Sequence, residues 1–245
     1  MTFQILILLI LLLIFYLKWY KHSALNTTLV TVQGESYNVH RQHHDPKKAA
    51  ELLDEIVNRN KVFIEHLSTK YSRSNNNVSV GNGKEGRIDI IPYSGTSGGA
   101  EDAIMNEMEY LETDMTYLAA RVTQLKDQYQ IDNIYEISPL NPSGSTSYTE
   151  NKGEKLVLCL RDKKPNAEGQ HEFHDINTLM FVVLHELTHI MNDRWGHKMQ
   201  YWKLFKFVLK NADEAGIYNP VNYREQPITY CGMNITYNPF HDASL

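Results

Sequence analysis

The chain has 245 residues, of which 42% are hydrophobic and 22% are charged, so it can build one sizeable hydrophobic core. Its net charge of −5 and the lack of a run rich in Lys and Arg argue against nucleic acid as a partner. Only two cysteines occur, Cys159 and Cys231, and they can either pair or stay reduced. We expect one domain over residues 23–245.

The first 22 residues have the character of a membrane anchor. Residues 3–17 are apolar apart from Gln4, and an aromatic pair flanked by Lys18 and Lys21 follows. A cleavable signal peptide normally has a basic segment before the apolar run, and here the positive charge comes after it. We predict one transmembrane helix in residues 1–22, in contact with the membrane through residues 3–20. The positive-inside rule then places the C-terminal domain of this single-pass protein in the cytosol.

The next segments predict ordinary secondary structure. Loose alternation of apolar residues over 28–40 predicts a short hairpin, and a helical stripe predicts a helix over 46–67. Between them lie His40, His43 and His44, which could form a second metal site, although a solvated loop before the helix is the favoured interpretation.

Residues 72–100 are rich in turn-forming residues and predict a flexible loop region, interrupted by a short strand over 87–91. Apolar residues spaced by fours and threes predict a second helix over 101–128. The apolar run within 154–161 predicts a strand. This strand could be an edge strand that holds an extended substrate, or it could be a plain core strand.

Residues 177–193 predict a buried helix that carries the sequence His185-Glu186-Leu187-Thr188-His189. His185 and His189 lie one turn apart on the same helix face, which is a spacing suited to zinc ligands. Glu186 can reach a zinc-bound water without binding the metal, so it is the candidate general base. A buried helix whose histidines only satisfy polar groups is the alternative. The uncharged residues before the motif and the candidate N-cap Asp175 favour the metal site.

A catalytic zinc site needs a third protein ligand, and two candidates follow the motif. His197 comes eight residues after His189, beyond a turn at Gly196, and we favour it over Glu214. The second nitrogen of each ligating imidazole needs an acceptor, for which the candidates are Asp193, Asp213 and Glu214. Candidates for a hydrogen bond to the developing oxyanion are Tyr223 and Tyr230.

The motif, followed by Gly196-His197 and the aromatic pair Tyr201-Trp202, resembles the WLM and SprT-like zinc metallopeptidases. The resemblance covers about residues 177–210. It implies an α+β, zincin-like metallopeptidase domain with a small sheet and an active-site helix. It also implies that His185, His189 and His197 bind Zn²⁺ and that Glu186 is the catalytic base. The apolar N-terminus before a compact domain also resembles uncharacterised proteins of large DNA viruses.

The sequence therefore predicts a membrane-anchored zinc-dependent metalloendopeptidase. It would hydrolyse peptide bonds of a protein or peptide substrate with a zinc-bound water activated by Glu186. Two alternatives remain. One is a non-catalytic membrane or virion structural protein that retains a zincin fold, and the intact Glu186 argues against it. The other is a glycan or amide hydrolase that uses the same metal chemistry in a closed pocket.

Overall fold

The computed structural model describes residues 26–71, 115–141, 144, 146–194 and 196–245, together with residues 7 and 10–13. Most of the expected anchor in residues 1–22 lies outside the described residues. So do the loop over 72–100, the strand over 87–91 and the first part of the helix expected over 101–128. Within the described part of the chain, no helix combines the length and the apolar character needed to cross a membrane.

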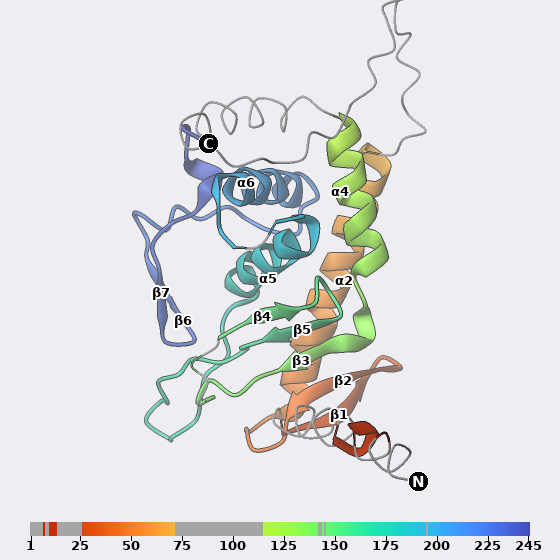
Figure 1. Cartoon of the computed structure of the whole chain (residues 1–245). Helices are drawn as coiled ribbons and strands as arrows, with labels where there is room; N and C mark the ends of the chain where they lie inside the picture. The colour runs from red at the N-terminus through yellow and green to blue at the C-terminus, as the bar shows by residue number, and fades with distance from the viewer. Residues whose placement is uncertain are drawn as a thin grey trace, which may run out of the picture.

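A mixed sheet of five strands forms the lower half of the molecule in Figure 1, in the order β1-β2-β3-β5-β4. Its strands are β1 (Thr27–Val32), β2 (Glu35–His40), β3 (Ile134–Glu136), β4 (Tyr148–Glu150) and β5 (Lys155–Leu158). The predicted hairpin over 28–40 is confirmed, since β1 pairs antiparallel with β2. Strands β2, β3 and β5 run parallel to one another, whereas β4 returns antiparallel to β5.

Strand β5 is not an edge strand, which corrects one of the two expectations for residues 154–161. It lies between β3 and β4, and its residues Leu156, Val157 and Leu158 are buried. Strand β4, which the sequence did not predict, is the edge strand instead. Three residues of intermediate burial are too short a pattern for period-two alternation to be recognised.

Four described helices pack beside the sheet: α2 (Pro46–Lys70), α4 (Met115–Gln128), α5 (Ile176–Met191) and α6 (Met199–Glu214). The expected helix over 46–67 is confirmed, with Pro46 in its first turn and the Asp45 side chain accepting a hydrogen bond from Lys48 N. Helices α5 and α6 pack against each other, and α2 contacts both of them and the β1–β2 hairpin (Figure 1). The predicted mixture of helices with a small sheet is therefore confirmed.

The C-terminal segment packs against α6 and is linked to the residue after β5. It contains a hairpin of β6 (Ile228–Tyr230) and β7 (Met233–Ile235), then a short 3-10 helix, η3 (Pro239–His241). The two cysteines, which the sequence left either paired or reduced, form a disulfide between Cys159 and Cys231. This bond ties the hairpin to the segment that follows β5.

Candidate metal centre

Helix α5 holds the first two histidines of the motif. The Asp175 side chain caps the helix by accepting hydrogen bonds from the backbone N and the hydroxyl of Thr178. Apolar residues of the helix are buried around most of its circumference, which fixes its orientation in the core. The rings of His185 and His189 consequently lie on one face, with their centroids 4.9 Å apart.

His197 returns to the same point from the turn between α5 and α6. Gly196 makes this turn possible with a φ of 82°, a backbone conformation that favours glycine. The Nε2 atoms of His197 and His185 are 3.0 Å apart. One ring nitrogen from each of the three histidines falls within a group no more than 4.8 Å across, a geometry that can hold one metal ion.

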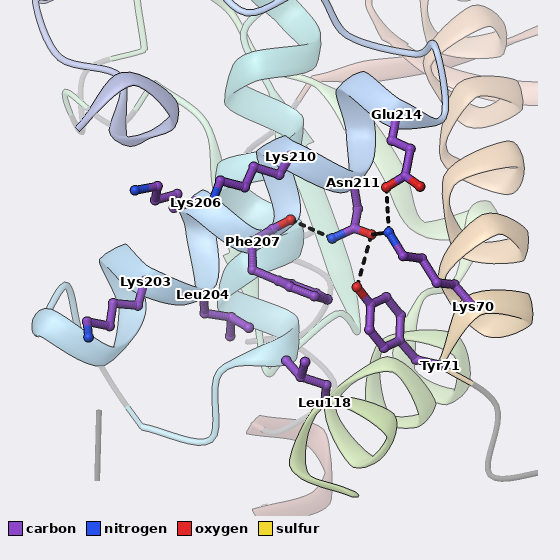
Figure 2. A pocket seen from close by; sticks show the side chains of 10 residues that line it. All are labelled: Lys70, Tyr71, Leu118, Lys203, Leu204, Lys206, Phe207, Lys210, Asn211 and Glu214. Carbon is purple, nitrogen blue, oxygen red and sulfur yellow. Dashed lines mark hydrogen bonds and ion pairs between the residues drawn. The ribbon is translucent and has the colours of Figure 1, made fainter. Parts of the chain in front are cut away.

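Glu214, the alternative third ligand, lies elsewhere. Its carboxylate is 2.5 Å from Lys70 Nζ and 3.8 Å from His66 Nε2. Figure 2 shows Glu214 at the end of α6 beside Lys70 and Asn211, in a pocket that contains none of the three histidines. Of the two candidates, His197 is the one that the fold brings to His185 and His189.

The three imidazoles are well suited to a cation. Burial, reinforced by the neighbouring histidines, lowers the pKa of His185 to about 3 and that of His189 to about 4. Burial also lowers the pKa of His197. Rings that stay neutral keep a lone pair for a metal, and three neutral nitrogen donors match the preference of Zn²⁺. The residues present therefore fit a zinc ion with a position left open.

Glu186 is held beside this group by the edge strand. Its side chain is buried, and its Oε2 accepts a hydrogen bond of 2.9 Å from Thr149 Oγ1 of β4. Burial raises the pKa of the Glu186 carboxyl to about 7, and the hydrogen bond from Thr149 opposes that rise. A carboxyl with a pKa near neutrality can both accept and donate a proton.

Tyr201 of α6 packs against all three histidines. Its ring stacks on His189 with centroids 4.6 Å apart, and its hydroxyl donates to the His185 carbonyl oxygen over 3.0 Å. The sequence had marked Tyr201 by its position after His197 but had given it no role. Its contacts indicate that it fixes the positions of the rings.

The expected acceptors for the second imidazole nitrogens are not found at the histidines. Among the described residues, Asp193 accepts a hydrogen bond from Gln200 and pairs with Arg121, while Glu214 pairs with Lys70. Sequence distance alone was a poor guide, because side chains near a ligand in the chain can point away from it.

A cavity of about 280 Å³ opens onto the three histidines and Glu186. Its other walls come from the start of β4, from the β4–β5 turn and from the loop after α5, through Ser147, Tyr148, Thr149, Lys152, Arg194 and Gly196. Lys152 joins two of these walls, because its Nζ donates to the carbonyl oxygens of His189 and Asn192 at the end of α5.

Neither tyrosine proposed as an oxyanion donor lines this cavity. The Tyr230 hydroxyl is 2.6 Å from Ser147 Oγ and donates to the Cys159 carbonyl oxygen over 2.8 Å, inside the core. Tyr223 is buried against Phe181, with ring centroids 4.9 Å apart. Both positions indicate that these tyrosines are packing residues.

The histidines at 40, 43 and 44 do not form a second metal centre of the same kind. Within the described residues, the group of His185, His189 and His197 is the one in which three or more ligand atoms converge. His40 and His43 do lie together, with ring centroids 4.5 Å apart, next to a cavity that is separate from the first.

Comparisons with known proteins identify a family and relatives of this chain. The model of the WLM domain matches residues 106–236. An uncharacterized protein of Acanthamoeba polyphaga mimivirus is 33% identical over 114 residues, which cover 46% of this chain and 54% of the relative. An uncharacterized protein of Invertebrate iridescent virus 6 is 38% identical over 76 residues, covering 31% of this chain and 40% of the relative.

A more distant relative is the DNA-dependent metalloprotease WSS1 homolog 2 of Schizosaccharomyces pombe. It is 26% identical over 113 residues, which cover 43% of this chain and 36% of the relative. The chain thus spans about half or less of the length of these relatives. No solved structure matches.

Proposed function

Because this chain belongs to the WLM domain family, which its match over residues 106–236 establishes, we propose that it is a zinc-dependent metallopeptidase. The observation that carries the proposal is the convergence of His185, His189 and His197 beside the buried carboxyl of Glu186. The name of the fission yeast relative supports the same class of enzyme.

In this proposal the three histidines are the zinc ligands and Glu186 is the catalytic base. A bound zinc ion would polarise the scissile carbonyl and lower the pKa of a coordinated water. Glu186 would take a proton from the attacking water and return it to the leaving amine. Thr149 keeps the Glu186 carboxylate at the cavity wall for both transfers, through the hydrogen bond from β4.

The substrate we propose is a protein or peptide in an extended conformation. Among the described strands, β4 is at the edge of the sheet and lines the cavity through Tyr148 and Thr149, so a peptide could pair with its outer side. We do not propose nucleic acid as a partner. The DNA dependence in the name of one relative belongs to a protein of which this chain covers 36%, and the net charge of this chain is −5.

We also propose that residues 3–20 anchor the enzyme in a membrane. Support comes from the sequence, in which an apolar run is followed by Lys18 and Lys21. These lysines favour a cytosolic domain, whereas the disulfide between Cys159 and Cys231 is more typical of an oxidising compartment.

The sequon that begins at the exposed Asn234 tests this orientation. The cytosolic orientation predicts that the full chain pellets with membranes after carbonate extraction and shows no glycosidase-sensitive mass. A glycosidase-sensitive mass would place the domain in the lumen instead, and a decrease of that mass in Asn234→Gln would assign one glycan to this sequon. Recovery of the chain in the supernatant would overturn the anchor.

The enzymatic proposal is tested by zinc analysis together with cleavage of a denatured protein substrate. The full chain is compared with Glu186→Gln and with the matched control Glu214→Gln, which changes the carboxylate that lies away from the histidines. We expect about one zinc per chain in all three proteins and loss of cleavage in Glu186→Gln alone. Zinc without cleavage by the native chain would favour a structural zincin fold. Absence of zinc would overturn the metal centre.

A further inference from the structure

A second cavity, of about 570 Å³, lies where three parallel strands end. The segments that follow β2, β3 and β5 come together at one end of the sheet (Figure 1). In sheets with parallel strands, the crevice at the carboxyl ends of the strands is where ligands commonly bind. No residue lines both this cavity and the one at the metal centre.

The lining of this cavity consists of neutral polar side chains and imidazoles, apart from Ile137, Leu140 and Gly169. It contains no Asp and no Glu, although the whole chain is acidic: its residues are His40, Gln42, His43, His44, Ile137, Ser138, Leu140, Asn141, Gly169, Gln170 and His171. The His43 ring lies between two others, with centroids 4.5 Å from His40 and 5.5 Å from His171. Such a lining supplies hydrogen-bond donors and no negative charge.

Contacts at the back of the cavity fix two of these rings. His43 Nε2 is 3.0 Å from Ser138 Oγ, and His171 Nδ1 is 2.9 Å from the Asp162 carbonyl oxygen. Since a carbonyl oxygen can only accept, His171 carries its proton on Nδ1 when it is neutral, and protonation would add a second donor at Nε2. In the part of the chain that the structure describes, each of these rings has one nitrogen engaged with the protein. The other nitrogen of His171, Nε2, can donate to a ligand only when the ring is protonated.

A fully buried arginine lies next to these histidines. The Arg161 Nε donates to Glu136 Oε1 over 2.7 Å, and the guanidinium lies 3.9 Å from the centre of the Phe173 ring. Its two terminal nitrogens, Nη1 and Nη2, are buried and have no hydrogen-bond partner among the described residues. The Arg161 charge is close enough to contribute to the lowered pKa values of His40 and His43.

The charges and the geometry at this cavity favour an anion over a cation as the ligand. The Arg161 charge, although paired with the Glu136 carboxylate, opposes protonation of His40 and His43 and would oppose a metal ion in the same way, and the histidines here do not converge as His185, His189 and His197 do. An anion would be stabilised by that charge and could accept hydrogen bonds from the imidazoles and from the side-chain amides.

We propose that this cavity is a binding site for a phosphate group, held by His43 and His171 over the buried charge of Arg161. The cavity is larger than one phosphate ion, so it has room for a small molecule that carries the group. The site is independent of the proposed peptidase chemistry, because it requires neither zinc nor Glu186.

Calorimetric titration of inorganic phosphate into the full chain tests this proposal. We expect saturable binding near one phosphate per chain, with a Kd below about 1 mM at low salt. His43→Ala and His171→Ala should each weaken binding by about tenfold. Lys210→Ala, which removes an exposed positive charge from α6 in the pocket of Figure 2, is the matched control and should leave binding unchanged.

Three results would overturn the proposal. The first is that no saturable heat is released at phosphate concentrations up to about ten times the expected Kd. The second is an equal loss of binding in Lys210→Ala, and the third is displacement of phosphate by equimolar acetate.

The long-range ¹H–¹⁵N spectrum of the imidazoles gives a second readout that does not depend on stability. In that spectrum phosphate should shift the signals of His43 and His171. The His185→Ala chain should bind phosphate like the native chain, whereas stoichiometric zinc binding at His43 in that variant would identify a metal site instead.

Discussion

The protein contains two groups of histidines that are assembled in opposite ways. The metal centre draws its three rings from 13 consecutive positions, 185–197, on one helix and the turn after it. The second group joins His40 and His43 to His171, across more than half of the chain. The first group has Glu186 beside it and Lys152 and Arg194 in the wall of the same cavity, whereas the second is near Arg161, which is paired with Glu136. We therefore propose different ligands for the two groups, because among the described residues three ring nitrogens converge in the first group, as a metal ion requires, and do not converge in the second.

The largest effect expected from this comparison follows from removal of one ring from each group. His185→Ala should lose stoichiometric zinc and reduce cleavage by about a thousandfold or more, because the metal supplies several kcal/mol of charge stabilisation. His43→Ala should keep both zinc and cleavage. Metal analysis and cleavage rates measured on the two variants in parallel check the contrast, and loss of zinc in His43→Ala would show that the groups are not separate.

A smaller loss is expected from the residue that orients the base. Thr149→Val removes the hydrogen bond to Glu186 and should lower kcat by roughly 10- to 100-fold while zinc content stays the same. Thr149→Ser keeps a hydroxyl and should recover most of the rate. Equal rates for the Val and Ser variants would show that Thr149 acts through packing alone.

Substitution of one glycine near each histidine group compares how tightly the backbone is packed at the two places. A Cβ on Gly153, in the β4–β5 turn, would lie 2.7 Å from the Gln128 carbonyl oxygen, whereas one on Gly169 would meet nothing within 4 Å. Both residues have a positive φ. Gly153→Ala should therefore lower the free energy of unfolding by about 2–3 kcal/mol, and Gly169→Ala by about 1 kcal/mol. Urea unfolding measures both changes, and equal losses would contradict the packing argument.

The smallest expected effect is the dependence of stability on pH at the second group. Burial, with the charges of His40, Arg161, His171 and His44, lowers the pKa of His43 from 6.5 to about 4. The folded protein thus binds a proton at His43 less readily than the unfolded chain. This contribution to stability is complete above pH 6.5 and is lost as the pH falls towards 4.

Urea unfolding of the native chain and of His43→Gln, at pH 7 and pH 4.5, isolates that contribution. The native chain should lose more stability on acidification than the variant, and added phosphate should reduce the difference. The effect is modest because the ring is only about half buried. The same acid sensitivity in both proteins would assign it to other groups.

The sequence by itself placed two of the three candidate zinc ligands. The spacing of His185 and His189 already fixes both rings on one helical face, and the uncharged residues before them predict the buried helix that carries them. The β1–β2 hairpin and α2 were also readable from local patterns. These features depend on residues near one another in the chain, for which helical or strand geometry alone sets the arrangement.

Only the tertiary structure decided the rest. It brought His197 rather than Glu214 to the two histidines, placed β5 inside the sheet and left β4 at its edge, and paired Cys159 with Cys231. The cavity at the strand ends was equally hidden, because its residues come from three loops. Long-range pairing of strands brings such loops together, and no local pattern specifies which strands will be neighbours.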